Sequence, residues 1–228
     1  MECAQEICEW RAAQRAELLA RRKAIAQSDR DRWSGRITQL LSEGFAITYG
    51  KIVGLYWPFQ GEFDPRFAIR QFRRSGAVAA LPAVLQKGAP LQFREWWPGV
   101  PCSKGVFNLP VPEGTAVVRP NVLLIPPVGF DLQGFRLGYG GGYYDRTLAV
   151  MAPQPLKIGV AFELSRIATI RPQPYDIPMD FIVTEAAIHH VSQGRLVRVT
   201  DPSEARKLSG QLVRNRELRS MKAKKTPH

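Results

Sequence analysis

The sequence has few cysteines and histidines and no long apolar run. Three cysteines, at positions 3, 8 and 102, occur among 228 residues, and no two of them form a CxxC pair. This scarcity argues against a disulfide scaffold and favours a reduced, cytoplasmic setting. Cys3 and Cys8 could form half of a zinc site, but no third cysteine or histidine lies nearby. No apolar run approaches the ~20 residues of a membrane span, and the start, MECAQEICEW, lacks the apolar core of a signal peptide.

Several common catalytic and nucleotide-binding signatures are also missing. The three histidines, His189, His190 and His228, lie near the end of the chain, so no Ser-His-Asp set is apparent. The glycine-rich stretch that ends at Gly142 is not followed by the Lys-Ser/Thr pair of a Walker A loop. Its glycine spacing is GxGxG, which also differs from the GxGxxG fingerprint of dinucleotide-binding domains.

Positive charge, in contrast, is present in excess, with a net charge of +12 at pH 7. Such a charge suits nucleic acids, acidic membranes or polyanionic small molecules. Residues 206–228 hold eight basic residues and one acid, so most of the excess lies in this tail. RNA-binding modules usually place aromatic residues among basic ones, and the tail has no aromatic residue. We therefore expect an α/β domain over residues 1–202, a flexible basic extension over residues 203–228, and no nucleic-acid partner.

The order of the expected helices and strands predicts one α/β domain. Apolar residues at helical spacing predict an N-terminal helical pair within residues 1–44. Further helices are expected at residues 65–76 and 143–151, and a hairpin at residues 190–199. Because strands alternate with helices, we expect a mainly parallel central sheet flanked by helices. The expected strands are residues 47–56, 77–81, 91–97, 121–125, 156–162 and 179–184.

The most informative segment is residues 129–145, between an expected buried strand and a helix. Four glycines lie within residues 138–142, where they permit positive φ and leave backbone N–H groups open to an anion. The positive end of the following helix points into the same loop. Arg136 offers donors suited to phosphate oxygens, and Asp145 offers an oxygen ligand for magnesium. The segment therefore favours a phosphate-binding loop, although a glycine-rich surface turn would contain the same glycines.

The whole segment, GFDLQGFRLGYGGGYYD, resembles the signature of the 5-formyltetrahydrofolate cyclo-ligase family. The resemblance extends in order over roughly residues 11–188. Arg11 and Arg15 resemble an N-terminal basic pair, YWPFQGE at residues 56–62 resembles a folate-binding strand end, and DIPMD at residues 176–180 resembles a closing element. Arg11 stands where lysine is frequent, and Gly141 stands where some members carry lysine. These departures leave open a family relative that binds ATP but acts on another substrate.

The resemblance implies an ATP-dependent ligase. In the family, ATP phosphorylates the formyl oxygen of 5-formyltetrahydrofolate, a neighbouring folate nitrogen closes the ring, and phosphate departs to leave 5,10-methenyltetrahydrofolate. Arg136 and Tyr143 would be catalytic, and Asp145 and Asp176 would hold Mg²⁺. The residues that would bind ATP are Arg11, Arg15, Arg136, Leu137, Gly138, Tyr139, Gly140, Gly141, Gly142, Tyr143 and Tyr144. Those that would contact the folate are Trp57, Glu62, Tyr139, Gly140, Gly141, Gly142 and Tyr143.

The sequence thus supports one leading interpretation and two alternatives. The leading one is a monomeric cytoplasmic enzyme that uses a reduced folate, ATP and Mg²⁺ and has no membrane attachment. The first alternative is the family relative with an altered substrate. The second is an RNA-binding accessory protein that uses its basic tail.

Overall fold

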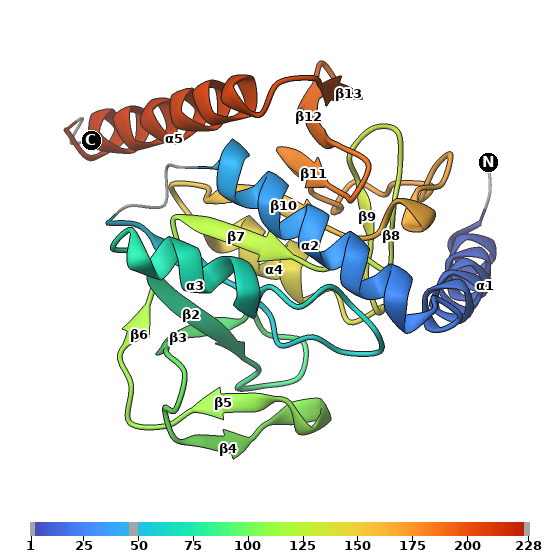
Figure 1. Cartoon of the computed structure of the whole chain (residues 1–228), viewed down its shortest axis with the longest axis horizontal. Helices are drawn as coiled ribbons and strands as arrows, with labels where there is room; N and C mark the ends of the chain where they lie inside the picture. The colour runs from blue at the N-terminus through green and yellow to red at the C-terminus, as the bar shows by residue number, and fades with distance from the viewer. Residues whose placement is uncertain (1–2, 46–49, 226–228) are drawn as a thin grey trace.

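A nine-stranded sheet with helices on both faces forms the body of the molecule (Figure 1). The computed structural model describes residues 3–45 and 50–225, with side chains as far as residue 222. The helices are α1 (Ala4–Lys23), α2 (Gln27–Gly44), α3 (Arg66–Arg74), α4 (Tyr143–Val150) and α5 (Pro202–Lys225), with short 3-10 helices η2 (Val106–Asn108) and η3 (Glu163–Ser165). The expected N-terminal helical pair is therefore confirmed as α1 and α2.

The main sheet has its parallel strands in the middle and antiparallel strands at both edges. Its order is β13 (Arg195–Val199), β12 (Ile188–Ser192), β11 (Phe181–Val183), β10 (Leu156–Val160), β7 (Val122–Ile125), β1 (Ile52–Gly54), β2 (Val78–Ala83), β3 (Gln92–Trp96) and β6 (Val117–Val118). The run from β11 to β2 is parallel throughout. The predicted fold class, α/β with a mainly parallel sheet, is confirmed, as is the hairpin, which is β12 and β13.

Two short hairpins lie outside the main sheet. One pairs β4 (Cys102–Lys104) with β5 (Pro110–Pro112), and the other pairs β8 (Gly129–Phe130) with β9 (Arg136–Leu137). Strand β1 is shorter than the predicted strand at residues 47–56, of which residues 47–49 lie outside the described part of the chain.

The central strand β7 is buried on both faces, as its uninterrupted apolar sequence predicts. Val122 and Leu124 pack in the same apolar cluster as α2 and α3. Leu123 and Ile125 pack in the opposite cluster with Leu148 of α4. Because side chains alternate along a strand, one short run of residues joins the two helical layers to the sheet.

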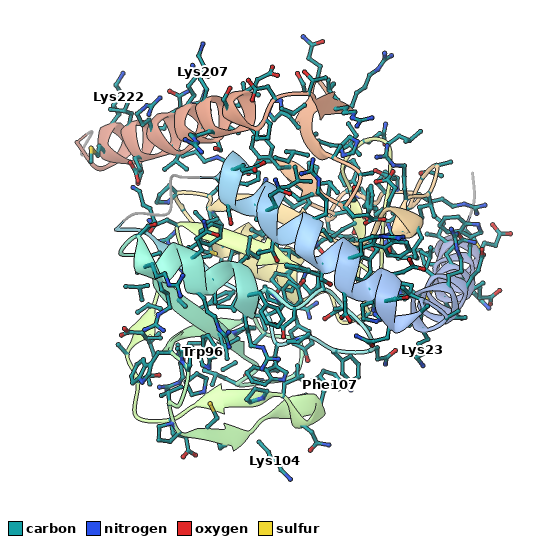
Figure 2. The ribbon with its side chains drawn as sticks, in the orientation of Figure 1. Lys23, Trp96, Lys104, Phe107, Lys207 and Lys222 are labelled. Atoms are coloured by element: carbon teal, nitrogen blue, oxygen red, sulfur yellow. The ribbon has the colours of Figure 1, made fainter. Side chains whose placement is uncertain are left out.

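Helix α5 packs against the body of the protein. Ala205, Ser209 and Val213 are buried, and the Arg216 guanidinium lies 2.7 Å from Asp180 Oδ1. The expected flexible extension is therefore contradicted for residues 203–222. The charge excess masked a buried face at helical spacing, whereas Lys207 and Lys222 point away from the sheet (Figure 2). Within the described chain, no helix combines the length and apolar character needed to cross a bilayer.

The packing of α5 can be tested with two substitutions on opposite sides of the helix. Val213→Ala removes two buried methyl groups and should lower the free energy of unfolding by about 1–2 kcal/mol. The control, Gln211→Ala, lies on the exposed side and should change it by less than about 0.5 kcal/mol. Urea unfolding of both variants is the measurement. Indistinguishable midpoints would show that α5 does not pack on the body in solution.

Candidate active site

A large cavity opens where the parallel strands β1, β2 and β7 end. Its volume is about 1120 Å³, and its walls include Tyr56, two residues after β1, and Val84 and Pro126, which directly follow β2 and β7. Between β1 and β7 the strand order reverses direction, because the chain runs from β1 to β2 on one side and returns to β7 on the other. Ligands of open α/β sheets bind at such a reversal. The volume exceeds that of most single-ligand pockets, so it suits two ligands side by side.

The glycine-rich loop forms one wall of this cavity and has the geometry expected of an anion-binding loop. Gly140 has φ +94°, and Gly142, the residue that precedes α4, has φ +63°. Both values are strained for residues with a side chain, which explains the glycines at these two positions. The N-terminus of α4 begins at Tyr143, so its positive end points toward the loop.

A buried carboxylate, which the sequence pattern did not single out as functional, organises the segment ahead of the glycines. Asp131 is fully buried, and its Oδ1 accepts hydrogen bonds from the backbone N–H of Gln133 (3.0 Å) and Phe135 (2.9 Å). Its Oδ2 accepts one from Ile170 N at 3.1 Å. Asp131 thus holds the β8–β9 turn closed and joins it to residue 170.

Two arginines of α1, both among the predicted ATP contacts, meet this wall of the cavity. Arg15 Nε donates to the carbonyl oxygen of Gly138 at 2.7 Å, and Arg11 lies 2.5 Å from Asp176 Oδ2. Arg11 also donates to the carbonyl of Ile170 at 3.1 Å. Burial, followed by the neighbouring charge of Arg11, lowers the pKa of the Arg15 guanidinium. Two cations held this close favour an anionic ligand between or beside them.

Arg136 is also buried, and it contacts the protein as well as the cavity. Its Nη1 donates to the carbonyl oxygen of Ile177 at 2.7 Å, and its Nη2 lies 2.7 Å from Asp145 Oδ1. The Nη2 contact meets the distance of an ion pair but lacks hydrogen-bond alignment, so this nitrogen has no aligned hydrogen-bond partner among the described residues. Burial lowers the pKa of Arg136, and the negative charge of Asp145 opposes that shift.

Asp145 and Asp176, the predicted magnesium ligands, lie on the same wall but are paired with arginines. Asp145 Oδ1 also accepts from Ile177 N at 3.0 Å, and Asp176 Oδ2 accepts from Gln173 N at 2.7 Å. Asp145 therefore contacts the backbone of Ile177, the residue that follows Asp176, and the structure brings the two carboxylates into the same neighbourhood. Across the described residues, no group of three His, Cys, Asp or Glu side chains could hold a metal.

The predicted folate contacts lie on the other side of the loop, around a buried carboxyl group. Glu62 Oε1 accepts from the Tyr139 hydroxyl at 2.7 Å, and Oε2 accepts from Phe59 N at 2.9 Å. Burial raises the pKa of Glu62 to about 7, against the opposing effects of the Tyr139 hydrogen bond and the Arg22 charge. Trp57 stacks under the Arg66 guanidinium, 4.1 Å from the ring centroid. Its indole also lines the cavity.

The two tyrosines that open α4 take different positions. Tyr143 lines the cavity with the Arg146 guanidinium 5.2 Å from its ring centroid. The Arg136 Cζ atom lies 6.0 Å from the ring centroid of Tyr144, and burial raises the pKa of the Tyr144 phenol. Arg146, which was not among the predicted site residues, also donates to the carbonyl oxygen of Gly141.

The β4–β5 hairpin supplies an apolar wall that the sequence did not predict. Phe107 lies at the end of this hairpin, has φ +61° and is 65% exposed (Figure 2). Val106, Leu109 and Val111 of the same hairpin also line the cavity. The segment between Pro101 and Pro110 mixes polar and apolar residues, so the sequence does not reveal that this hairpin lines the cavity.

Together, the reversal in strand order, the arginine cluster and the glycine-rich loop define an α/β enzyme site for anionic ligands. A family model described as the 5-formyltetrahydrofolate cyclo-ligase family matches residues 7–185. The chain therefore belongs to this family, and the resemblance predicted from the loop is confirmed, as is the ligase class of enzyme.

Individual relatives support the same assignment over most of the chain. The 5-formyltetrahydrofolate cyclo-ligase of Escherichia coli K12 is 28% identical over 180 residues, which cover 74% of this chain and 96% of that protein. The Mycolicibacterium smegmatis protein of the same name is 29% identical over 178 residues, covering 75% and 91%. The solved structure of Aquifex aeolicus 5,10-methenyltetrahydrofolate synthetase is 27% identical, with a TM-score of 0.70 over 83% of this chain and 97% of the other.

The raised pKa of Glu62 predicts a specific pH dependence of stability. Because its pKa is about 7 in the folded protein against an ordinary 4.5, the folded state binds this proton more tightly than the unfolded chain. Stability should therefore fall as the pH rises from about 4.5 to 7. Glu62→Gln should remove up to ~3 kcal/mol of that fall, measured by urea unfolding at pH 5 and pH 8. Glu9→Gln, an exposed residue of α1, is the control and should keep the wild-type pH dependence. If the stability of Glu62→Gln fell with rising pH as much as that of the wild type, the buried position of this carboxyl would be contradicted.

Proposed function

We propose that this protein catalyses the ATP-dependent conversion of 5-formyltetrahydrofolate to 5,10-methenyltetrahydrofolate, with release of ADP and phosphate. The observation that carries the proposal is the position of the glycine-rich loop between two different half-sites of one cavity. On one side the loop meets Arg11 and Arg15, which suit a polyphosphate. On the other side Tyr139 of the same loop meets Glu62, which suits the polar edge of a pterin. The names of the relatives support the folate as one of these ligands.

The chemistry proposed requires positioning more than a protein nucleophile. The γ-phosphoryl group of ATP passes to the formyl oxygen, and ADP leaves. The neighbouring folate nitrogen attacks the formyl carbon and gives up its proton, and phosphate departs with the former formyl oxygen and that proton as the ring closes. Phosphoryl transfer depends on alignment and on charge stabilisation. In keeping with this, no histidine is found among the described residues that line the cavity.

The nucleotide side of the cavity offers a consistent set of cationic groups. Arg136 and Arg15 both line the cavity, and Arg15 lies beside Gly140. Arg146 places a further cation at Gly141, the position where some family members carry lysine. We propose that these side chains and the backbone of residues 137–144 hold the phosphates, and that Arg136 and Tyr143 stabilise the group in transfer.

The two carboxylates fit a magnesium ion that arrives with the nucleotide. Mg²⁺ in such sites is typically held by one or two carboxylates, waters and phosphate oxygens, so a cluster of three acidic side chains is not required. Both described side-chain contacts of Asp145 use Oδ1, and Asp176 faces the same cavity. We propose that Asp145 and Asp176 would hold the metal, whose charge would supply electrostatic stabilisation of the phosphates.

The remaining expectations follow from this function and are proposed with it. They are a cytoplasmic location, a monomeric state and the absence of a nucleic-acid partner. The thiols of Cys3, Cys8 and Cys102 are all free, as a reduced compartment would allow.

The function can be tested directly by following the absorbance of methenyltetrahydrofolate. Product should form from 5-formyltetrahydrofolate only when ATP and Mg²⁺ are both present, and excess EDTA should reduce turnover by at least about a hundredfold because metal charge is needed for the transfer. ADP formation, measured in the same samples, should match methenyl product one to one. Full turnover in EDTA would contradict the proposed requirement for Mg²⁺. ATP hydrolysis without methenyl product would favour the relative with an altered substrate.

The loop is tested by placing a β-branched side chain at Gly140. Gly140→Val forces valine into φ +94° beside the phosphate-binding backbone, at a strain of about 1–3 kcal/mol. The control is Gly99→Val. Gly99 has a similar φ of +90° but does not line the cavity, and no atom lies within 4 Å of the added Cβ. Both variants should melt at similar temperatures, but only Gly140→Val should lose ATP affinity, by at least about tenfold in calorimetry. Equal ATP affinity in both variants would mean that the glycine-rich loop is only a turn.

A further inference from the structure

A third arginine of α1 lies beside the two that face the nucleotide side, but its contacts are different. The side chain of Arg22 is 3% exposed. Its Nε donates to the carbonyl of Gln60 at 3.2 Å, and its Nη1 to the carbonyl of Pro127 at 3.4 Å. These carbonyls follow β1 and β7, the two strands that flank the reversal in strand order. Helical spacing alone groups Arg22 with Arg11 and Arg15 as phosphate ligands, whereas its contacts give it another role.

The remaining nitrogen of Arg22 starts a hydrogen-bond chain that ends at Glu62. Nη2 donates to the Tyr139 hydroxyl at 2.6 Å, and that hydroxyl donates to Glu62 Oε1 at 2.7 Å. Since a guanidinium can only donate, the phenol accepts from Arg22 and can give its one proton to the ionised Glu62. Arg22 Nη2 is itself 3.9 Å from Glu62 Oε1. The guanidinium therefore acts on the carboxylate both directly and through the hydroxyl.

We propose that Arg22 is a positioning residue that, through the Tyr139 hydroxyl, keeps Glu62 ionised and aimed at the folate. This proposal rests on the function proposed above. It assigns Arg22 no contact with either ligand.

The charges around Glu62 explain why one arginine has such influence. The titratable groups that face the carboxyl are Tyr139 of the loop, Tyr56 after β1, Tyr144 of α4 and Arg22 of α1. Arg22 is the one cation in that described set. Burial raises the pKa of Glu62 to about 7, and Arg22 is one of the groups that lower it. Without Arg22 the pKa of the carboxyl would rise further, so more of it would be protonated at neutral pH and would offer a donor where the carboxylate accepts.

Arg22 also fixes the backbone that carries Glu62. Gln60 has φ +48°, a left-handed conformation that is rare for a residue with a side chain. Its carbonyl accepts from Arg22 Nε, and the next carbonyl, of Gly61, accepts from Arg30. Both arginines come from the N-terminal helices, so the helical pair holds this turn in the conformation that directs Glu62 into the cavity.

The experiment is a pH profile of kcat/KM for 5-formyltetrahydrofolate from pH 6 to 9. In Arg22→Met the acid limb should move upward by about one pH unit, since an opposite charge at this distance typically lowers a carboxyl pKa by at least that much. At a pH below the acid-limb midpoints of both proteins, kcat/KM of Arg22→Met should be about tenfold lower than that of the wild type. At a pH above both midpoints, the two values should differ little. The KM for ATP should change less than about twofold. Arg21→Met, an exposed neighbour paired with Glu17, should keep the wild-type profile.

A second variant keeps the proposal testable if Arg22→Met does not fold. Tyr139→Phe keeps the ring and Arg22 but removes the hydroxyl, so its acid limb should also move upward. If both single variants fold, the double variant should lose less than the sum of the two, because both act on Glu62. An unmoved acid limb in the folded variants, or an ATP KM that rises as much as the folate KM, would overturn the proposal.

A readout without turnover separates this proposal from the proposed function. The Glu62 carboxyl can be titrated by carbon-13 NMR, with Glu62→Gln to identify its signal. If the wild type makes no methenyl product, the proposed function fails. The midpoint of Glu62 should nevertheless rise in Arg22→Met, and an unchanged midpoint would overturn the role of Arg22 alone.

Discussion

The docking of helix α1 on the glycine-rich loop is the interaction on which the site depends. Arg15 binds the carbonyl of Gly138, Arg22 binds the hydroxyl of Tyr139, and Arg11 binds the segment that carries Asp176. A loop with two left-handed glycines has few conformational restraints of its own, so these contacts from outside select one conformation. The helix therefore both shapes the loop and supplies its positive charge.

The parts of the fold that could be predicted are those whose structure is indicated by the residues of a single segment. Strand β7 is apolar at every position because both of its faces are covered, and the loop after it has glycines where the backbone needs positive φ. The prediction of a flexible extension was wrong for α5 for the opposite reason. Its charge is visible along the whole segment, whereas its buried face depends on α2, which lies far away in the sequence. A count of charges cannot reveal which residues of a helix face the protein.

The sequence predicted a set of site residues that the structure brings to one cavity, but it could not give their chemical environment. The loop motif identified Arg136, Tyr139 and Asp145, and all three line the cavity. The sequence could not show that Arg136 is paired with Asp145 or that Glu62 is buried enough to titrate near neutral pH. Those properties come from walls that several elements build together, among them the β4–β5 hairpin with Phe107. Desolvation depends on all of these walls at once, so no single motif encodes it.

The excess of arginine acquires a structural explanation from the same contacts. Loops at the carboxyl ends of parallel strands leave backbone carbonyls without sheet partners, and a buried carbonyl needs a donor. Arg22 serves Gln60 and Pro127, Arg11 serves Ile170, and Arg136 serves Ile177. A guanidinium can bind such carbonyls and still present a donor to a second group, which an ammonium with its single point of charge does less well. These three arginines are thus committed inside the body of the protein, around the cavity, whereas most of the net charge of +12 lies in residues 206–228.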